Sequence, residues 1–208
     1  MGAMLKKYHR LSGLVMAAFL LLHISNHLFA LGGPAWHISV MNFFRLIYRF
    51  PPIEILLLMC VIFQIASGII LIFKKGFLKQ PLYVKLQVMS GLYLSFFLIF
   101  HVWAVLIARY HWNIETDFYF AAGVANRRPD KLFFIPYYTL SLLSVFTHIA
   151  CAHYAKRVEQ LKVFPYPMYK GLFRIKYRRE AIRIGIAGLV ITLLIMLAFT
   201  GVLYDIEA

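Results

Sequence analysis

Five apolar stretches of about 20 residues constrain the fold of this chain more than any other feature of its sequence. We expect them at residues 11–31, 52–73, 86–108, 132–154 and 182–203. A helix of this length can cross the hydrocarbon core of a bilayer, and a helix satisfies its own backbone hydrogen bonds in lipid. The sequence therefore predicts an all-α integral membrane bundle of five transmembrane helices, formed by residues 1–208 as a single domain.

The composition and the placement of charge support this interpretation. The chain is 62% hydrophobic and 14% charged, which excludes an ordinary soluble domain. Its net charge of +14 would suit nucleic-acid binding, but if the spans alternate, sixteen Lys and Arg residues fall on one side and six on the other. Because short cytoplasmic loops are enriched in Lys and Arg, we expect a cytoplasmic N-terminus and an external C-terminus. The basic side would face membrane lipid or an acidic partner, and no nucleic acid is expected.

Four of the spans contain a polar side chain deep within the apolar run: His23, Gln64, His101 and His148. Such residues are costly in lipid and commonly mark a function. A histidine that faces the interior of a helix bundle is a natural axial ligand for haem iron. Each of these residues could instead form an ordinary hydrogen bond between two helices and bind no haem.

Depth predicts how these residues pair. At 1.5 Å per residue, His23 and His101 lie about 18 and 24 Å from the cytoplasmic starts of their spans, in the outer half of the membrane. Gln64 and His148 lie in the inner half. We therefore expect His23 to meet His101, and Gln64 to meet His148.

The remaining histidines are weaker candidates. His27 shares a helix face with His23 near the outer boundary, where it is expected to contact a haem propionate or a quinone. His153 should face elsewhere, because it follows His148 by five residues. Three more fall in predicted loops or interfaces and are not expected to be ligands: His9, His37 and His111.

The segments between the spans have patterns of their own. Residues 35–50 have apolar side chains at helical spacing around Arg45 and Arg49, which predicts an amphipathic helix along the outer interface. The outer loop 110–130 has aromatic residues in its first part and polar residues in its second part. The inner stretch 163–177, rich in tyrosine and basic residues, is predicted to be surface structure.

Six segments together resemble a known family. In order they are HRLSG (9–13), FLLLHISNH (19–27), PPIEI (51–55), LQVMSG (86–91), FFLIFHVW (96–103) and LSVFTHI (143–149). Their order and spacing over the first four spans resemble the five-helix, two-haem cytochrome b subunit that anchors succinate dehydrogenase and fumarate reductase to the membrane.

The resemblance implies a set of haem ligands. In that family the first and third spans hold an outer haem, and the second and fourth spans hold an inner haem. His23, His101 and His148 match ligand positions, whereas Gln64 stands where the family has a histidine. Because an amide oxygen is a poor iron ligand compared with imidazole, we expect an outer haem b on His23 and His101. The inner position is then expected to lack an ordinary bis-histidine haem: the haem would be absent, five-coordinate through His148, or ligated by another residue.

The resemblance also implies partner subunits and a location in the cell. An iron–sulfur subunit and a flavoprotein subunit would dock on the cytoplasmic side, and the chain would pass electrons between them and a membrane quinone. It would sit in the cytoplasmic membrane of a prokaryote and take no part in the dicarboxylate chemistry. Its two cysteines, Cys60 and Cys151, lie inside apolar spans without the spacing of a metal site, so they are interpreted as buried hydrophobic residues.

Quinone reduction consumes protons, so acidic or hydroxylic side chains near the membrane edge are candidates for a quinone site. On the outer side this is Glu54, which could equally be a carboxylate that stabilises a helix N-terminus. On the inner side the candidates are Arg10, Ser12, Gln87 and Ser90, which could equally be interfacial capping and snorkelling residues.

Two other functions stay open: a self-contained transmembrane cytochrome b that transfers electrons, and a haem-free anchor or assembly protein.

Overall fold

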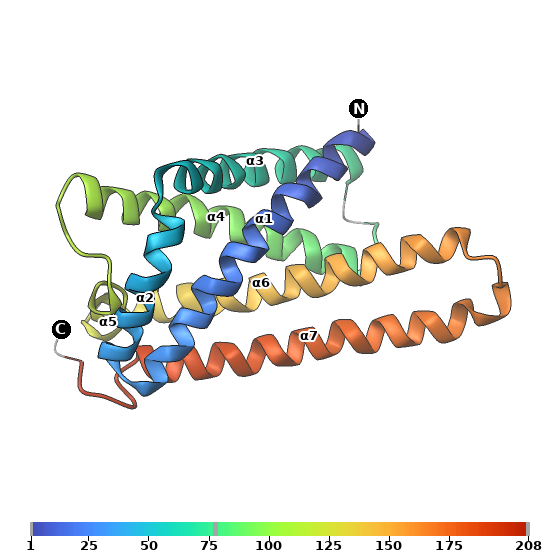
Figure 1. Cartoon of the computed structure of the whole chain (residues 1–208). Coiled ribbons are helices and arrows are strands. Elements are labelled where there is room, and N and C mark those ends of the chain that lie inside the picture. The colour runs from blue at the N-terminus through green and yellow to red at the C-terminus, as the bar shows by residue number, and fades with distance from the viewer. Residues whose placement is uncertain (1, 77–78, 207–208) are drawn as a thin grey trace.

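The computed structural model describes residues 2–76 and 79–206, and over these residues the chain is an all-α bundle (Figure 1). Five helices are long and apolar enough to cross a membrane. They are α1 (Gly2–Phe29), α3 (Pro51–Lys75), α4 (Leu82–Tyr110), α6 (Lys131–Gln160) and α7 (Lys170–Phe199). The predicted fold class is confirmed, and the chain is an integral membrane protein.

The outward faces of the long helices are apolar. Leu21 is 69% exposed, Ile62 69% and Leu193 57%. In water such surface would cost about 25 cal/mol per Å², whereas in lipid it costs nothing. The buried positions include small and hydroxyl-bearing residues such as Ser67 and Thr192, both 1% exposed, which is typical of helix contacts inside a bilayer.

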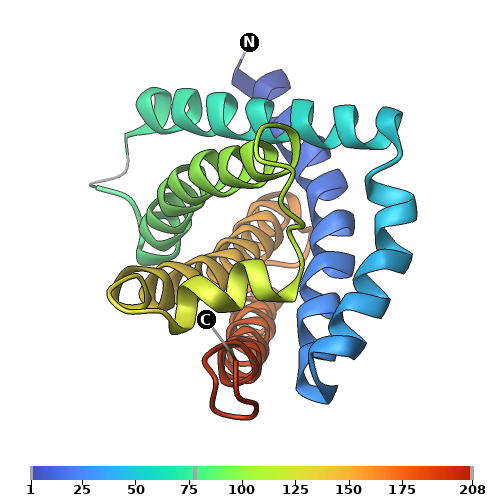
Figure 2. The same ribbon diagram turned by 90° about the vertical axis from the view of Figure 1, so that its left-hand side faces the viewer.

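Helices α6 and α7 run side by side along most of their length (Figures 1 and 2). Gly188 of α7 makes this approach possible, because a Cβ atom there would lie 2.2 Å from the side chain of Phe146 on α6. Helix α1 crosses the bundle obliquely and packs on α3, while α4 packs on α6. These two pairings decide which polar residues meet.

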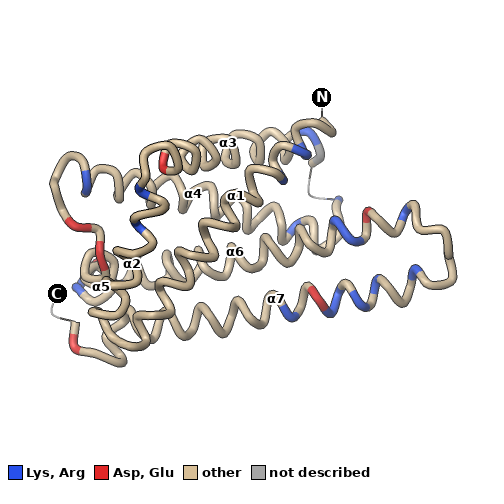
Figure 3. Tube along the Cα trace, viewed as in Figure 1, with Lys and Arg blue, Asp and Glu red and all other residues tan. Residues whose placement is uncertain are grey.

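The two ends of the bundle differ in charge (Figure 3). Most Lys and Arg residues gather at the end that contains the N-terminus and the turn between α6 and α7, which we call the basic end. This turn contains the short helices η2 (Leu161–Val163) and η3 (Pro167–Tyr169). The other end, which we call the opposite end, contains α2 (Pro34–Tyr48), α5 (Phe118–Asn126) and the C-terminal segment.

At the opposite end, η1 (Ala30–Gly32) follows α1, and α2 then runs across the bundle from the end of α1 to the start of α3 (Figures 1 and 2). The helix predicted over residues 35–50 is confirmed. Helix α5 was not predicted. It begins after Asp117, whose Oδ1 accepts the backbone N–H of Tyr119 at 2.9 Å and of Phe120 at 3.4 Å. An aspartate directly before an aromatic and alanine run was the available signal for this start.

The helix that contains the fifth predicted span, residues 182–203, begins earlier and ends sooner than that span. Helix α7 begins at Lys170 and ends at Phe199, so part of the stretch 163–177 is helical. Hydropathy detects the apolar part of a helix and misses its basic first turns. At the other end the chain turns at Gly201, whose φ of +68° is the left-handed conformation that favours glycine and ends helices.

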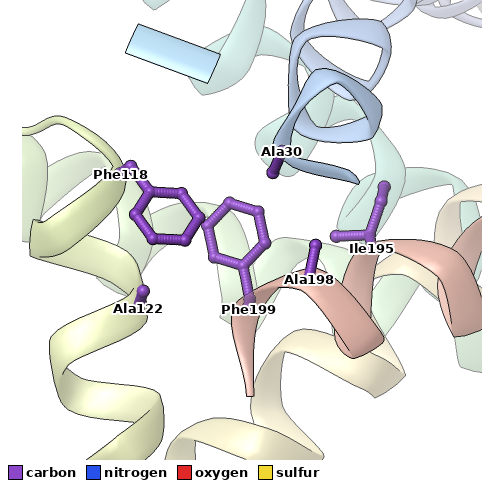
Figure 4. Close-up of a cluster of buried hydrophobic side chains, with 6 residues drawn as sticks. All are labelled: Ala30, Phe118, Ala122, Ile195, Ala198 and Phe199. Atoms are coloured by element: carbon purple, nitrogen blue, oxygen red, sulfur yellow. The ribbon is translucent and has the colours of Figure 1, made fainter. Parts of the chain in front are cut away.

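A hydrophobic cluster holds the opposite end together (Figure 4). It joins the end of α1 to α5 and the end of α7, through Ala30, Phe118, Ala122, Ile195, Ala198 and Phe199. The rings of Phe118 and Phe199 are 4.9 Å apart. Nearby, the Tyr204 hydroxyl donates to the Leu31 carbonyl, and Asn126 Nδ2 donates to the Phe199 carbonyl at 2.9 Å. The C-terminal segment is thereby tied to α1 and α5.

Candidate functional site

His23 of α1 and His101 of α4 face one another with ring centroids 6.3 Å apart. Their predicted proximity is confirmed. Each imidazole stacks on the phenylalanine four residues earlier in its helix, Phe19 at 5.3 Å and Phe97 at 4.8 Å. Residues four apart lie on the same helix face, so each phenylalanine supports its histidine in the space between α1 and α4.

The spacing of these two rings suits a shared metal ion. An imidazole nitrogen lies about 2 Å from a bound transition metal. Two imidazoles that bind one ion from opposite sides therefore have ring centres about 6 Å apart. The observed 6.3 Å agrees with this value. His23 and His101 thus have the separation that two axial ligands of a haem require.

Two further histidines continue from this pair toward the opposite end. His27 Nε2 lies 3.4 Å from His23 Nε2, and His27 Nδ1 lies 3.1 Å from His37 Nε2. Asn26 Nδ2 is also 3.1 Å from His37 Nε2. We call His23, His27, His37 and His101 the four-histidine cluster. Through His27 the cluster reaches α2, while the predicted contact of His27 with a haem propionate or a quinone stays a prediction.

His37 is the functional candidate that the sequence interpretation missed. It was assigned to an interface, but it is 2% exposed, and its ring lies 5.5 Å from those of Phe118 and Phe199. Burial, together with the nearby charges of His23 and Arg45, lowers the pKa of His37 to about 4, so its imidazole is neutral at pH 7.

Two buried polar atoms beside this cluster have no hydrogen-bond partner within the described residues: His37 Nδ1 and Asn26 Oδ1. An unpaired buried polar atom costs about 1–3 kcal/mol. Such atoms mark a position where a water molecule or a ligand oxygen would be bound.

A second group of polar side chains lies toward the basic end. His148 of α6 donates its Nδ1–H to the Gln87 carbonyl of α4 at 3.0 Å, with Ser90 Oγ 3.5 Å from the same nitrogen. Gly91 faces this ring, because a Cβ atom there would lie 3.1 Å from His148 Cε1. The ring of His148 is thus held against α4 by its Nδ1 side.

Gln64 does not form the predicted pair with His148. Its Nε2 donates to the His9 carbonyl at 2.6 Å and to Ser12 Oγ at 2.7 Å, so its amide hydrogens are used on α1. The prediction failed because depth along a helix does not say which neighbour a side chain faces. Helix α3 packs on α1, and Gly13 leaves room for the amide there: a Cβ atom at Gly13 would lie 3.3 Å from Gln64 Nε2.

The ring of His9 is bound to α3, the helix that contains Gln64. It lies within α1 and not in a loop, and its Nδ1 is 2.7 Å from Ser67 Oγ on α3. Ser67 gives its own proton to the Phe63 carbonyl, so it accepts from His9. Gly68 also faces this ring, with a Cβ position 3.6 Å from His9 Cε1. We call His9 and His148 the two-histidine cluster.

The candidate quinone residues lie in different surroundings. At the opposite end, Glu54 Oε1 is paired with Arg109 at 2.5 Å, and both side chains are mostly buried. This pair joins α3 to α4, so Glu54 has a structural role. Its predicted part in quinone binding stays a prediction. Toward the basic end, Arg10 pairs with Glu159 of α6 at 2.9 Å in an exposed contact that also includes Lys6.

The other three inner candidates contact the two-histidine cluster. Ser12 binds Gln64, while Gln87 and Ser90 hold His148. Ser90 also lines a shallow, mostly apolar cavity of about 220 Å³ between α4 and α6, together with Leu86, Met89, Tyr93, Leu143, Ser144 and Thr147. Their predicted part in quinone binding stays a prediction.

The site is made of paired histidines and not of a larger set of metal ligands. In residues 2–76 and 79–206, no group of three or more His, Cys, Asp or Glu side chains is arranged to hold a metal ion. Cys60 and Cys151 are buried free thiols, as expected. Comparisons of the chain with protein families, with curated proteins and with solved structures find no match.

Proposed function

We propose that this chain is a membrane cytochrome b in which His23 and His101 are the axial ligands of one haem b, in the half of the bundle near the opposite end. The observation that supports this most directly is the 6.3 Å separation of the two imidazoles across α1 and α4. A bound haem supplies one-electron transfer, and the protein tunes it through the axial ligands and their surroundings.

The residues around the pair suit such a group. Phe19 and Phe97 stack on the ligand rings and provide an apolar lining, which limits the access of water. The unpaired Nδ1–H of His37 offers a hydrogen bond to an anionic oxygen such as that of a haem propionate. The neutral state of His37 at pH 7 leaves this donor in place without adding a buried charge.

We further propose that the chain is the anchor subunit of a succinate:quinone oxidoreductase, either a succinate dehydrogenase or a fumarate reductase. The resemblance of six sequence segments supports this assignment. The basic end would face the cytoplasm of a prokaryote and receive an iron–sulfur subunit together with its flavoprotein. The density of Lys and Arg there supports both this orientation and a partner with an acidic surface (Figure 3). Membrane quinone is the electron donor or acceptor, with Glu54 and Ser90 as candidates at the two ends.

The visible and electron paramagnetic resonance spectra of the purified chain test the haem proposal. We expect a low-spin haem b signal that His23→Ala and His101→Ala each abolish, because bis-imidazole ligation gives the low-spin state. His111→Ala is the control, since His111 is exposed beyond the end of α4. A wild-type chain purified without haem would reject the proposal and favour a haem-free anchor, in which the four histidines only bond one another.

Co-purification separates the finer alternatives. A flavoprotein and an iron–sulfur protein should be recovered with the tagged chain from its native membrane. Recovery of a haem protein without these partners would favour a self-contained electron-transferring cytochrome.

A further inference from the structure

Helix α7 has a small hollow on its surface at the basic end of the bundle, where its Lys and Arg residues gather (Figure 3). The hollow has a volume of about 200 Å³ and is lined by Leu172, Ile175, Lys176, Arg179, Glu180 and Arg183. Three of these residues are basic and follow one another at steps of three and four residues, so they share one face of the helix. We call Lys176, Arg179 and Arg183 the basic triad.

The charges of the basic triad are not balanced by acidic side chains. Across residues 2–76 and 79–206, no member of the triad forms an ion pair, whereas Arg45 and Arg109 each pair with a glutamate. The carboxylate that lines the hollow belongs to Glu180, and it is bound to His153 Nε2 on α6 at 2.9 Å. The hollow therefore has three cations and one carboxylate that is already engaged, which makes its charge complementary to an anion.

The basic triad lies at the level of the lipid headgroups. The contact between Glu180 and His153 places these two residues at the same height on α7 and α6. Next to His153 is Tyr154, whose ring lies 5.0 Å from that of Tyr83 on α4. Tyrosine rings collect where a bilayer meets water. The triad begins four residues before Glu180 and ends three residues after it, so it spans this level.

The same face of α7 continues into the membrane as an apolar stripe. Ile186 is 57% exposed, Val190 49% and Leu193 57%. They follow Arg183 at steps of three and four residues, whereas Thr192, on another side of the helix, is buried in the bundle. A face that is apolar in the hydrocarbon region and basic at the headgroup level matches a molecule with acyl chains and an anionic head.

We propose that the basic triad and the apolar stripe form a binding site for an anionic phospholipid in the leaflet at the basic end. The headgroup phosphate lies in the hollow, and the acyl chains lie along Ile186 and Val190. Basic residues beside a membrane span attract anionic lipid, and arginine binds phosphate oxygens through two parallel N–H donors. This inference goes beyond the proposed function and does not depend on haem.

Native mass spectrometry of the purified full chain tests the site. The probes are phosphatidylglycerol, which is anionic, and phosphatidylcholine with the same acyl chains, which has no net charge. We expect the wild type to bind phosphatidylglycerol more tightly. In Arg179→Gln/Arg183→Gln the affinity for this lipid should fall about 20-fold, because each basic residue near an anionic surface contributes about fivefold in affinity. The affinity for phosphatidylcholine should not change.

A matched variant controls for net charge. Arg174→Gln/Arg178→Gln also removes two exposed arginines from the first turns of α7, but neither residue lines the hollow. This variant should keep the preference for phosphatidylglycerol. Equal losses in the two double variants would overturn the site in favour of a general attraction between anionic lipid and the basic end.

The remaining outcomes identify other ligands. Equal binding of the two lipids by the wild type would overturn the proposal. Displacement of phosphatidylglycerol by an equimolar amount of inorganic phosphate would also overturn it, in favour of a site for free phosphate. Release of an acidic soluble protein from the chain by Arg179→Gln/Arg183→Gln, with lipid binding unchanged, would show that the hollow is a protein docking surface and not a lipid site.

Discussion

The two histidine clusters differ in what binds their ring nitrogens. In the four-histidine cluster, His27 lies between His23 and His37 and contacts a nitrogen of each. In the two-histidine cluster, each Nδ1 is bound to an oxygen of the helix scaffold and each Nε2 is left available. The comparison shows that the rings of His9 and His148 are each held by an oxygen of a neighbouring helix, whereas His23, His27 and His37 are held partly by one another.

The clusters differ also in how they are enclosed. Helix α2, helix α5 and the hydrophobic cluster of Figure 4 cover the four-histidine cluster at the opposite end. Toward the basic end, the nearest ion pairs, between Glu159 and the side chains of Lys6 and Arg10, are exposed. Exposed ion pairs contribute about 0–1 kcal/mol, so the position of His9 depends on its contacts with α3 and not on these charges.

The largest expected effect comes from filling the space beside His148. In Gly91→Val the new Cβ would lie 3.1 Å from His148 Cε1, and the two methyl groups would crowd the ring further. Overpacking of this kind costs about 1–3 kcal/mol, so we expect the Tm of the purified protein to fall clearly in Gly91→Val, as measured by thermal unfolding in detergent.

Gly185→Val is the matched control, because nothing lies within 4 Å of a Cβ atom at Gly185 on α7. Equal Tm values for the two valine variants would show that His148 does not pack tightly against Gly91.

A smaller effect is expected from removing the hydrogen-bond partner of His9. Ser67→Ala takes away the oxygen that accepts His9 Nδ1–H. A hydrogen bond of this kind contributes about 1 kcal/mol to stability. We therefore expect the Tm of Ser67→Ala to fall by less than that of Gly91→Val, as measured by thermal unfolding in detergent.

Ser141→Ala provides the comparison for this measurement, since Ser141 is also buried and its hydroxyl binds only the carbonyl of Tyr138 in its own helix. Identical Tm values for the two alanine variants would contradict the role given to Ser67.

The smallest effect concerns the pH dependence of stability that arises from His37. His37 has a pKa of about 4 in the folded chain against 6.5 for an unperturbed histidine, so the folded state binds fewer protons. Burial of the neutral imidazole therefore costs no stability above pH 6.5, whereas the free energy of unfolding decreases as the pH falls from 6.5 toward 4. We expect the Tm of the haem-free protein to fall over this range, and His37→Asn to flatten the decrease. A wild-type Tm that stays constant from pH 7 to 4 would contradict this.

Much of the architecture could be predicted from the sequence, because it depends on properties of short stretches of chain, such as apolar length and the spacing of apolar residues. Apolar length predicted five spans, and helical spacing predicted α2. Depth predicted the proximity of His23 and His101, because both lie on helices that cross the membrane in the same direction. Helix α5 depends on a single capping residue, Asp117, and the true ends of α7 depend on a basic segment and on Gly201; hydropathy does not register these features.

The identity of the polar neighbours was decided by the tertiary structure alone. Sequence position indicates how deep Gln64 and His148 lie, but the direction each faces depends on how α3 packs on α1 and α6 on α4. Nearby basic residues made the position of His9 resemble an interface, although Ser67 and Gln64 hold it within the helix contact. Which nitrogen of each histidine remains free depends on oxygens from other helices, up to 61 positions away along the chain. No local pattern contains that information, because a hydrogen bond of this kind exists only after the helices have packed.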